Sequence, residues 1–472
     1  MLPTPRNYSL YPSIVPADKP VDLIIVPNER AFLLVEGAEY QLTLIAVNGD
    51  ETSYHSPTSH KHLTATAKDG VLRFTYTFPG EGEHLIRLCN EEKCLQELRA
   101  YSLYEDLYAL TPLKGDFHSH TFRSDGNRDP AAAAGHYREQ GYDFYALTDH
   151  NRFYPGGEID EVYKDTKTGF YRVTGEEVHV PGTVVHIVHA GGKESVANQY
   201  IHNRDTHNRE LADCLNRVPA DIPEQYKECY ARAMWATEAI HKAGGLAIFA
   251  HPYWAPGGSR VYNVNDEFAR ILLRSGMFDA YELVGGMGQA GVNRSVAMWS
   301  ELRAEGHNIP VVGSSDVHGM EKASTFPFYF TICFAEKKEN DSIIASVKSG
   351  NSVAVEMNGY EYDKQYRCYG SLRLVSYAQF LLRYYFPNHE RICQGEGVAM
   401  RSYAMGMADA QLVNLIAEQA ENDQLRFFGR KAPVLPSQEI LDFEAKWRER
   451  HLTEGPHTKG SDVDAPKITR QI

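Results

Sequence analysis

The sequence predicts an α/β protein in which repeated strand and helix units lie between a β-rich first part and a mainly helical last part. Segments before residue 110 alternate apolar and polar side chains, which is typical of strands with one buried face. From about residue 112, short apolar runs alternate with helix-like segments that end in glycine, which is typical of a parallel sheet. These patterns divide the chain into three predicted domains, residues 1–110, 111–355 and 356–472.

The first domain is predicted to be a β-sandwich-like accessory domain. AFLLVEGAEYQLTLIAV alternates in part, and VLRFTYTF, PGEG and EHLIRL together have the form of a hairpin with proline and glycine in the turn. Closure of these strands into the sheet of the next domain is the alternative interpretation. We expect the domain to cover the active face, select substrates or form an oligomer contact.

In the middle domain, polar and titratable residues come where each apolar run stops, as in DFYALTDH, GLAIFAHP and IPVVGSSDVHG. Functional groups gather at the carboxyl ends of the strands in such sheets and barrels, so we expect a site there. Residues 194–229 are polar and are predicted to be a partly helical insertion or lid beside the same face. The last domain, residues 356–472, contains helix-like stretches such as AQLVNLIAEQAE and ends in a polar, loose tail.

The composition restricts the location and the partners. The start of the chain lacks the basic and then apolar pattern of a secretory signal, and no apolar run is long enough to span a membrane, so we expect a cytoplasmic protein. Seven scattered cysteines agree with a reducing compartment. The formal charge of -14 disfavours a stable nucleic-acid complex, although it permits a small phosphorylated substrate if bound cations reverse the local sign. A homo-oligomer is compatible with the sequence.

Residues that commonly bind metals occur at five separate strand ends. Imidazoles and carboxylates together suit zinc, manganese or iron. His118 and His120 are two positions apart, so on a strand they point to the same side and can hold one ion, and Asp316 and His318 repeat this spacing. Each residue alone is weak evidence, but their joint occurrence predicts a metal site. The candidates are His118, His120, Asp125, Asp149, His150, Glu176, Glu177, His186, His251, Asp316 and His318.

The segments HSHTFRSDG, LTDHN, GEEV, HIV, AHP and GSSDVHG resemble the successive motifs of the PHP family, named for polymerase and histidinol phosphatase. The resemblance covers about residues 112–355. It implies a distorted (βα)7 TIM-like barrel with two or three divalent ions at the carboxyl face, in a metal-dependent phosphoesterase. Carried over by position, it assigns His118, His120, Glu177 and Asp316 to one ion, Asp125, His150 and His318 to a second, and Glu177, His186 and His251 to a third.

Two of these assignments involve a choice between neighbours. Glu177 is preferred to Glu176 because the family has glycine, any residue, then glutamate, here beginning at Gly175. His186 is preferred to His189 because the family's histidine precedes two aliphatic residues. His189 is the alternative ligand at this position.

The implied reaction is hydrolysis of a small phosphorylated metabolite or nucleotide by a hydroxide that bridges two ions, with Glu177 and Asp316 as catalytic ligands. Arg123 and Arg294 are candidates for contact with the phosphate, and Arg152 and Lys193 also lie near the motifs. Asp116 and Asp149, which lie close to ligand histidines, are expected either to accept imidazole N–H groups or to cap backbone groups.

Two other functions compete with this one. An amidohydrolase-type enzyme would use similar ligands on an amide or lactone, but such enzymes commonly have a bridging lysine where this chain has Glu177. A non-catalytic binding or scaffold protein would work through the β-rich domain. Such a protein should have lost several ligands, whereas this sequence retains the full set.

Overall fold

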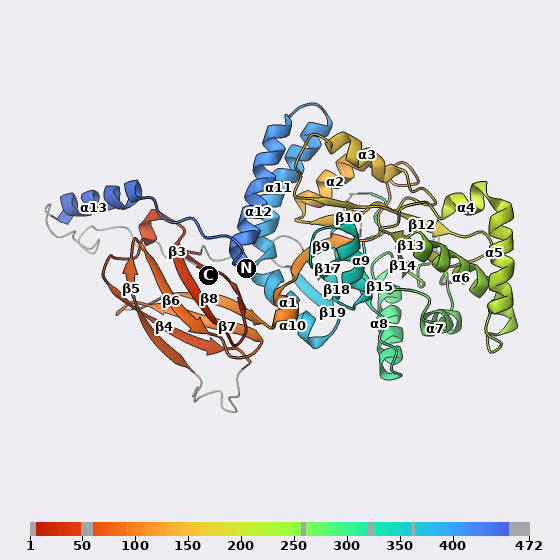
Figure 1. The fold of residues 1–472 in the computed structure, drawn as a ribbon, viewed down its shortest axis with the longest axis horizontal. Helices are drawn as coiled ribbons and strands as arrows, with labels where there is room; N and C mark the ends of the chain where they lie inside the picture. The colour runs from red at the N-terminus through yellow and green to blue at the C-terminus, as the bar shows by residue number, and fades with distance from the viewer. Residues whose placement is uncertain are drawn as a thin grey trace, which may run out of the picture.

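The structure is a computed structural model that describes residues 6–48, 60–91, 93–255, 261–319, 325–359 and 364–452. Figure 1 shows the N-terminal strands as a lobe at one side, the α/β part at the other, and helices α11 (Phe386–Ala404) and α12 (Ala410–Phe427) between them. The predicted loose tail, residues 454–472, lies outside the described residues.

The N-terminal lobe is one eight-stranded sheet with the order β1-β3-β6-β5-β4-β7-β8-β2. The two ends of this sheet approach each other, as two hydrogen bonds between β8 and β1 show. The side-chain amide of Gln96 on β8 accepts from the backbone N–H of Tyr8 on β1 at 3.0 Å and donates to the Tyr8 carbonyl at 2.7 Å. The β-rich prediction therefore holds, but the sheet is barrel-like and nearly closed, and a two-sheet sandwich is not confirmed. The strands are β1 (Tyr8–Tyr11), β2 (Ile14–Pro16), β3 (Pro20–Pro27), β4 (Glu39–Ala46), β5 (Lys61–Lys68), β6 (Val71–Thr77), β7 (Gly82–Cys89) and β8 (Cys94–Leu103).

The α/β part contains a six-stranded sheet, β11-β10-β9-β17-β18-β19, and a five-stranded sheet, β12-β13-β14-β15-β16. The strands of the first sheet are β9 (Thr111–Asp116), β10 (Phe144–Ala146), β11 (Tyr171–Val173), β17 (Tyr329–Ala335), β18 (Ser352–Asn358) and β19 (Gln365–Tyr369). Those of the second are β12 (Gly175–His179), β13 (His186–Ala190), β14 (Leu246–Phe249), β15 (Ala280–Val284) and β16 (Val311–Gly313). The apolar side chains of these strands form the core, which explains their nearly continuous burial.

Two features separate this architecture from the implied (βα)7 barrel, which is not confirmed as a regular barrel. Strand β13 runs antiparallel to both β12 and β14. Strand β17 runs antiparallel along β9, with Thr331 opposite Gly115 and Ala335 opposite Thr111. It thus takes the edge of β9 that the last strand of a closed parallel barrel would occupy. The coarser prediction of a mixed α/β fold holds.

The two sheets meet beyond the carboxyl ends of β9, β10 and β16 and at the middle of β12. Isolated parallel bridges join Ser119 to Val317 and His150 to Glu177. The backbone N–H of Asp316 donates to the carbonyl of His118 at 2.9 Å. Segments more than 190 residues apart are thereby fixed side by side where the predicted ligands lie.

Helices surround these sheets. The predicted insertion forms α4 (Ala197–His202) and α5 (Arg204–Arg217), and the Tyr200 hydroxyl reaches the carbonyl of His179 at 3.1 Å, so α4 borders the site. The other helices of the α/β part are α2 (Pro130–Glu139), α3 (Pro155–Tyr163), α6 (Lys227–Lys242), α7 (Asp266–Arg274), α8 (Gln289–Ala304) and α9 (Asn340–Lys348). Short helices α1 (Glu105–Tyr108), η1 (Arg30–Phe32) and η2 (Glu224–Tyr226) occur in connections.

The C-terminal part is mainly helical, as predicted, and comprises α10 (Leu372–Tyr384), α11, α12 and α13 (Gln438–Leu452). Helix α11 approaches α2 closely because glycines face each other: an ideal Cβ on Gly397 would lie 2.4 Å from the carbonyl of Gly135. The boundary expected after residue 355 falls within β18, which contributes to the α/β sheet.

Candidate metal centre

Glu177, at the carboxyl face of β12, lies at the centre of a ring of histidines and is completely buried. Its Oε2 lies 2.8 Å from His150 Nδ1 and 3.3 Å from His118 Nε2. Its Oε1 lies 3.1 Å from both His186 Nδ1 and His251 Nε2. One carboxylate therefore contacts imidazoles from four different strand ends.

Asp316 faces the same space from the end of β16. Its Oδ1 lies 3.0 Å from His120 Nε2 and 3.3 Å from His118 Nε2. Candidate ligand atoms of His118, His120, Glu177 and Asp316 lie within 4.8 Å of one another, so this group could hold one metal ion. Glu177, His186 and His251 form another such group.

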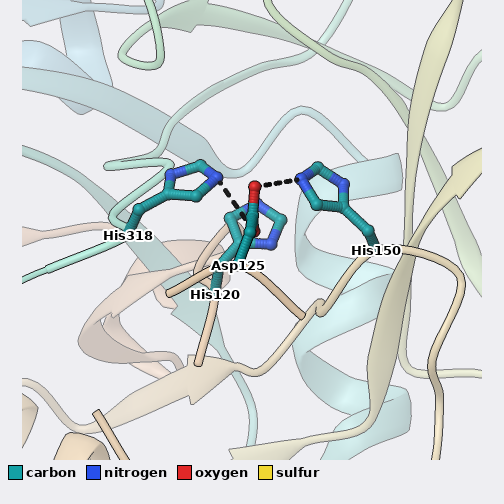
Figure 2. A group of neighbouring side chains, drawn as sticks. All are labelled: His120, Asp125, His150 and His318. Carbon is teal, nitrogen blue, oxygen red and sulfur yellow. Dashed lines mark ion pairs between the residues drawn. The ribbon is translucent and has the colours of Figure 1, made fainter. Parts of the chain in front are cut away.

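A more open group lies at the edge of the cluster and is drawn in Figure 2. The carboxylate of Asp125 points between His150 and His318, 3.3 and 3.4 Å from their Nε2 atoms, with the ring of His120 alongside. The Asp125 side chain is 55% exposed and that of His318 is 40% exposed. These four residues could hold an ion that solvent and a ligand can reach.

Two residues of the cluster have strained backbones. His251 has a φ of 23° and Asp316 a φ of 50°, in the left-handed region that residues with a Cβ rarely adopt. Such conformations persist only where the surrounding structure enforces them. They aim both side chains at the shared space around Glu177.

The polar atoms in this cluster fit divalent ions, because several of them have no hydrogen-bond partner of their own. They lie close to carboxylates but without hydrogen-bond geometry, and leaving them buried in this way costs free energy unless an ion binds them. The orphaned buried atoms that face Glu177, or belong to it, are His118 Nε2, His150 Nδ1, His179 Nε2, His186 Nδ1 and Glu177 Oε2. Imidazole and carboxylate donors together suit borderline and hard divalent ions.

The electrostatics of the cluster also favour cations. Burial alone would raise the pKa of the Glu177 carboxyl, but the charge of His118 and the close approach of the neighbouring imidazoles hold that pKa well below its ordinary value. Burial lowers the pKa of His120 and of His186 to about 4, so these two imidazoles are neutral at pH 7, whereas burial is outweighed by the surrounding carboxylates, which raise the pKa, for His118, for His150 and, to about 9, for His251. Neutral imidazole is the form that binds a metal.

The two aspartates near ligand histidines hold backbone groups. Asp116 accepts the N–H groups of His118 and Ser315, at 3.1 and 3.0 Å, and so fixes the end of β9 beside the end of β16. Asp149 accepts the N–H and the hydroxyl of Thr121, at 2.8 and 2.7 Å. Of the two expected roles, the structure thus has both aspartates capping backbone, and these bonds position the segment that carries His120 and Asp125.

Sequence reasoning missed the carboxylate that orients His118. Glu282, on β15, is completely buried, and its Oε2 lies 2.9 Å from His118 Nδ1. A carboxylate behind a ligand histidine fixes the ring and its tautomer. The available signal was a single acid inside the otherwise apolar run AYELV.

His179 was also missed. It follows Glu177 by two residues on β12, so both side chains lie on the same face. Its Nε2 lies 3.1 Å from Glu177 Oε1, and its ring stacks on that of His186 at 3.7 Å. The spacing of two from Glu177 was the signal that could have found it.

The structure places the two excluded neighbours on the opposite side of β12 and β13. Glu176 accepts from the Ser195 hydroxyl at 2.8 Å and from the Val196 N–H at 2.5 Å, beside the start of α4. His189 Nδ1 lies 3.4 Å from Glu176 and points away from Glu177 and its ring of histidines.

The predicted phosphate-binding arginines have other partners. Arg123 pairs with Glu158 at 2.7 Å. Arg294 pairs with Asp266, and its guanidinium lies over the rings of Tyr253 and Tyr262. Arg152 and Lys193 are exposed. Contact of any of these cations with a substrate stays a prediction.

No family model and no curated protein matches the chain. Solved structures similar to it include a two-domain protein of Bacteroides vulgatus, described as containing a predicted PHP-like metal-dependent phosphoesterase, with 16% identity and a TM-score of 0.36 over 56% of this chain and 76% of that one. Another is a protein of Bifidobacterium adolescentis described as a putative metal-dependent phosphoesterase, with 19% identity and a TM-score of 0.32 over 49% of this chain and 94% of that one. The description of the first of these structures thus names the PHP family, which the motifs of this chain also resemble.

A third similar structure is an amidohydrolase of Chromobacterium violaceum with bound sulfate and no metal, with 17% identity and a TM-score of 0.30 over 45% of this chain and 89% of that one.

Within the part of the chain that the structure describes, no helix has the length and apolar character needed to cross a membrane.

Proposed function

We propose that the protein is a metal-dependent phosphoesterase that hydrolyses a small phosphorylated metabolite or nucleotide. The observation that carries this proposal is the convergence of orphaned, buried imidazole and carboxylate atoms on Glu177. Hydrogen bonding alone leaves these atoms unsatisfied, whereas two or three divalent ions would bind them.

The ions would be zinc, manganese or iron, shared among the nine ligands that the sequence predicts. His118, His120, Glu177 and Asp316 would hold the first; Asp125, His150 and His318, with His120 beside them, the second; Glu177, His186 and His251 the third. His179 is added here as a candidate neighbour of the second and third ions.

When bound, such ions supply Lewis acidity: they lower the pKa of water and neutralise charge on a phosphoryl group. The residues of the chain position the metal ligands and determine where a phosphate can enter. Glu282 orients the His118 ring, and Asp116 holds the backbone at the ends of β9 and β16 together. Asp125 and His318 form the exposed edge through which a phosphate would enter. Because Glu177 and Asp316 are both anionic, a phosphate would approach only after cations reverse the local sign.

The test is turnover of a panel of phosphate esters after loading with manganese or zinc, with amides and lactones included. We expect hydrolysis of phosphate esters that is lost on chelation and in His118→Ala. The matched control is His241→Ala, because His241 bonds Asp279 at the end of α6, away from the cluster. Turnover of amides or lactones alone would favour the amidohydrolase-type alternative, and inertness with metals bound would contradict both enzymes.

A further inference from the structure

A cavity of about 560 Å³ opens beside the metal cluster. Tyr253, Trp254 and Tyr262, which follow β14, line one side, and Gly286 and Met287, which follow β15, line the other. Its volume is in the range of small-molecule sites. It is formed by the segments that follow β14, whose carboxyl end carries His251, and β15, which carries Glu282.

The cavity and the cluster share a wall. The Trp254 ring centroid lies 6.1 Å from that of His186 and 6.1 Å from that of His251. An ideal Cβ on Gly286 would lie 3.0 Å from both Asp316 Oδ2 and Glu282 Oε1, so this backbone separates the cavity from the carboxylates. Trp254 is thus the side of the cavity nearest the cluster, and a phosphate ester bound beside His186 and His251 would place its other end against Trp254.

The chemistry of the lining is apolar and aromatic. Among the described residues that line the cavity, none is charged. Among these described residues, a second phosphate or a carboxylate on the substrate would meet no cation and an ammonium group no carboxylate, so a charge buried against them would lose its hydration without compensation. An uncharged group fits better.

The aromatic side chains are held in place before any ligand arrives. Tyr253 and Tyr262 pack edge to face, with centroids 5.6 Å apart. The Arg294 guanidinium lies over both rings, 5.7 and 5.2 Å from their centroids, and is itself fixed by Asp266. This arrangement gives Arg294 a role in positioning the cavity wall. Rigid aromatic walls favour planar ligands that stack or pack against their edges.

We propose that the alcohol portion of the substrate carries an uncharged planar ring, which occupies this cavity against Trp254. The inference rests on the proposed phosphoesterase function, because the phosphate is what places the ring. It disfavours phosphorylated amino alcohols and diphosphorylated polyols, because the described lining residues offer no partner for a second charge.

The test compares two phosphate monoesters with leaving groups of similar basicity, benzyl phosphate and cyclohexylmethyl phosphate, with glycerol phosphate as the ring-free substrate. In the metal-loaded parent we expect kcat/KM for benzyl phosphate to exceed that for cyclohexylmethyl phosphate by about tenfold. In Trp254→Leu that ratio should fall close to one while metal content is retained. Trp447→Leu, the same change on exposed α13, should leave the ratio unchanged.

An unchanged ratio in Trp254→Leu, or a preference for glycerol phosphate, would overturn the inference. Failure of the proposed function gives a different result, because every ester would then be inert. Benzylphosphonate binding to the metal-loaded protein, measured by calorimetry against cyclohexylmethylphosphonate, covers that case. If every ester is inert but the protein prefers benzylphosphonate and loses this preference in Trp254→Leu, the cavity binds a planar ring and the proposed hydrolysis is wrong. Equal binding of the two phosphonates would contradict the proposed ring site.

Discussion

Two regions of this protein bury several ionisable side chains, and they differ in how those side chains are satisfied. One is the cluster around Glu177. The other lies between α2 and α11 and contains Arg138, Asp143, His389 and Glu396, each at most 2% exposed. In this second region, called here the ionic core, Arg138 Nε donates to Glu396 at 2.7 Å. His389 Nε2 lies 2.9 Å from Asp143, which also accepts the Lys114 N–H at 3.0 Å.

None of the four residues of the ionic core has a buried polar atom without a partner. In the cluster around Glu177, by contrast, at least five buried atoms lack one. Burial of charge is therefore not what distinguishes a functional site in this fold. The ionic core is complete by itself and joins helices, whereas the proposed divalent ions would complete the cluster.

The largest expected effect is that of Glu177→Gln. Removing the central charge should lower metal content and reduce phosphoesterase kcat/KM at least about 1,000-fold, equivalent to about 4 kcal/mol of transition-state stabilisation. Metal analysis and kinetics on one preparation measure this. Glu176→Gln is the matched control, because its side chain faces the start of α4, and it should keep its metals. Equal losses in both variants would show that the contrast between the faces of β12 is wrong.

Arg138→Met tests the opposite region. Breaking a buried ion pair on one side leaves Glu396 unpaired, and we expect a loss of about 3 kcal/mol in the free energy of unfolding, measured in denaturant. The folded fraction should retain its metals. Arg217→Met removes an exposed pair with Glu238 and should cost less than about 1 kcal/mol. Loss of metals in folded Arg138→Met would mean that the two regions are not independent.

The ionic core also makes a prediction about pH. Burial opposes the charged form of His389, but Cys393 and Asp143 raise its pKa to about 10. Because this exceeds the ordinary histidine value, its contribution is complete below about pH 6.5 and is lost as the pH rises through about 10. Between pH 7 and pH 9 the parent should lose about 2 kcal/mol more than His389→Gln. Parallel curves of unfolding free energy against pH would contradict this.

A smaller effect is expected for Glu282→Gln. The variant keeps the size of the side chain but removes the charge behind His118, and metal affinity should weaken about tenfold to a hundredfold. Competition with a chelator measures the affinity. Glu356→Gln, another buried acid on β18, should leave it unchanged.

The smallest effect on metal affinity is expected for His179→Ala, which tests whether His179 binds metal in addition to the nine predicted ligands. His179→Ala should weaken metal binding about tenfold, because Glu177 and the other histidines remain. The same chelator competition detects it, with His241→Ala as the control. An affinity equal to that of the parent would make His179 a packing neighbour of His186 only.

The sequence predicted the candidate site better than the fold around it. Seven of the nine predicted ligands lie together because they follow β9, β10, β14 or β16, whose carboxyl ends meet at one face. Glu177 lies within β12, and His186 begins the antiparallel strand β13 at the same face. Glu282 and His179 were missed because one acid in a strand, or one histidine two residues after another ligand, is not distinctive without its neighbours. The edge taken by β17 and the near-closure of the N-terminal sheet through Gln96 depend on pairings between distant segments. Local patterns do not encode such pairings.

The most direct test of the central claim is the metal content of protein purified without chelator and then reconstituted with manganese or zinc, measured by elemental analysis. The orphaned atoms around Glu177 predict two or three divalent ions per chain, and fewer in Glu177→Gln. A content near zero after reconstitution of the folded parent would contradict the account, because the orphaned atoms of the cluster would then lack the ions proposed to bind them.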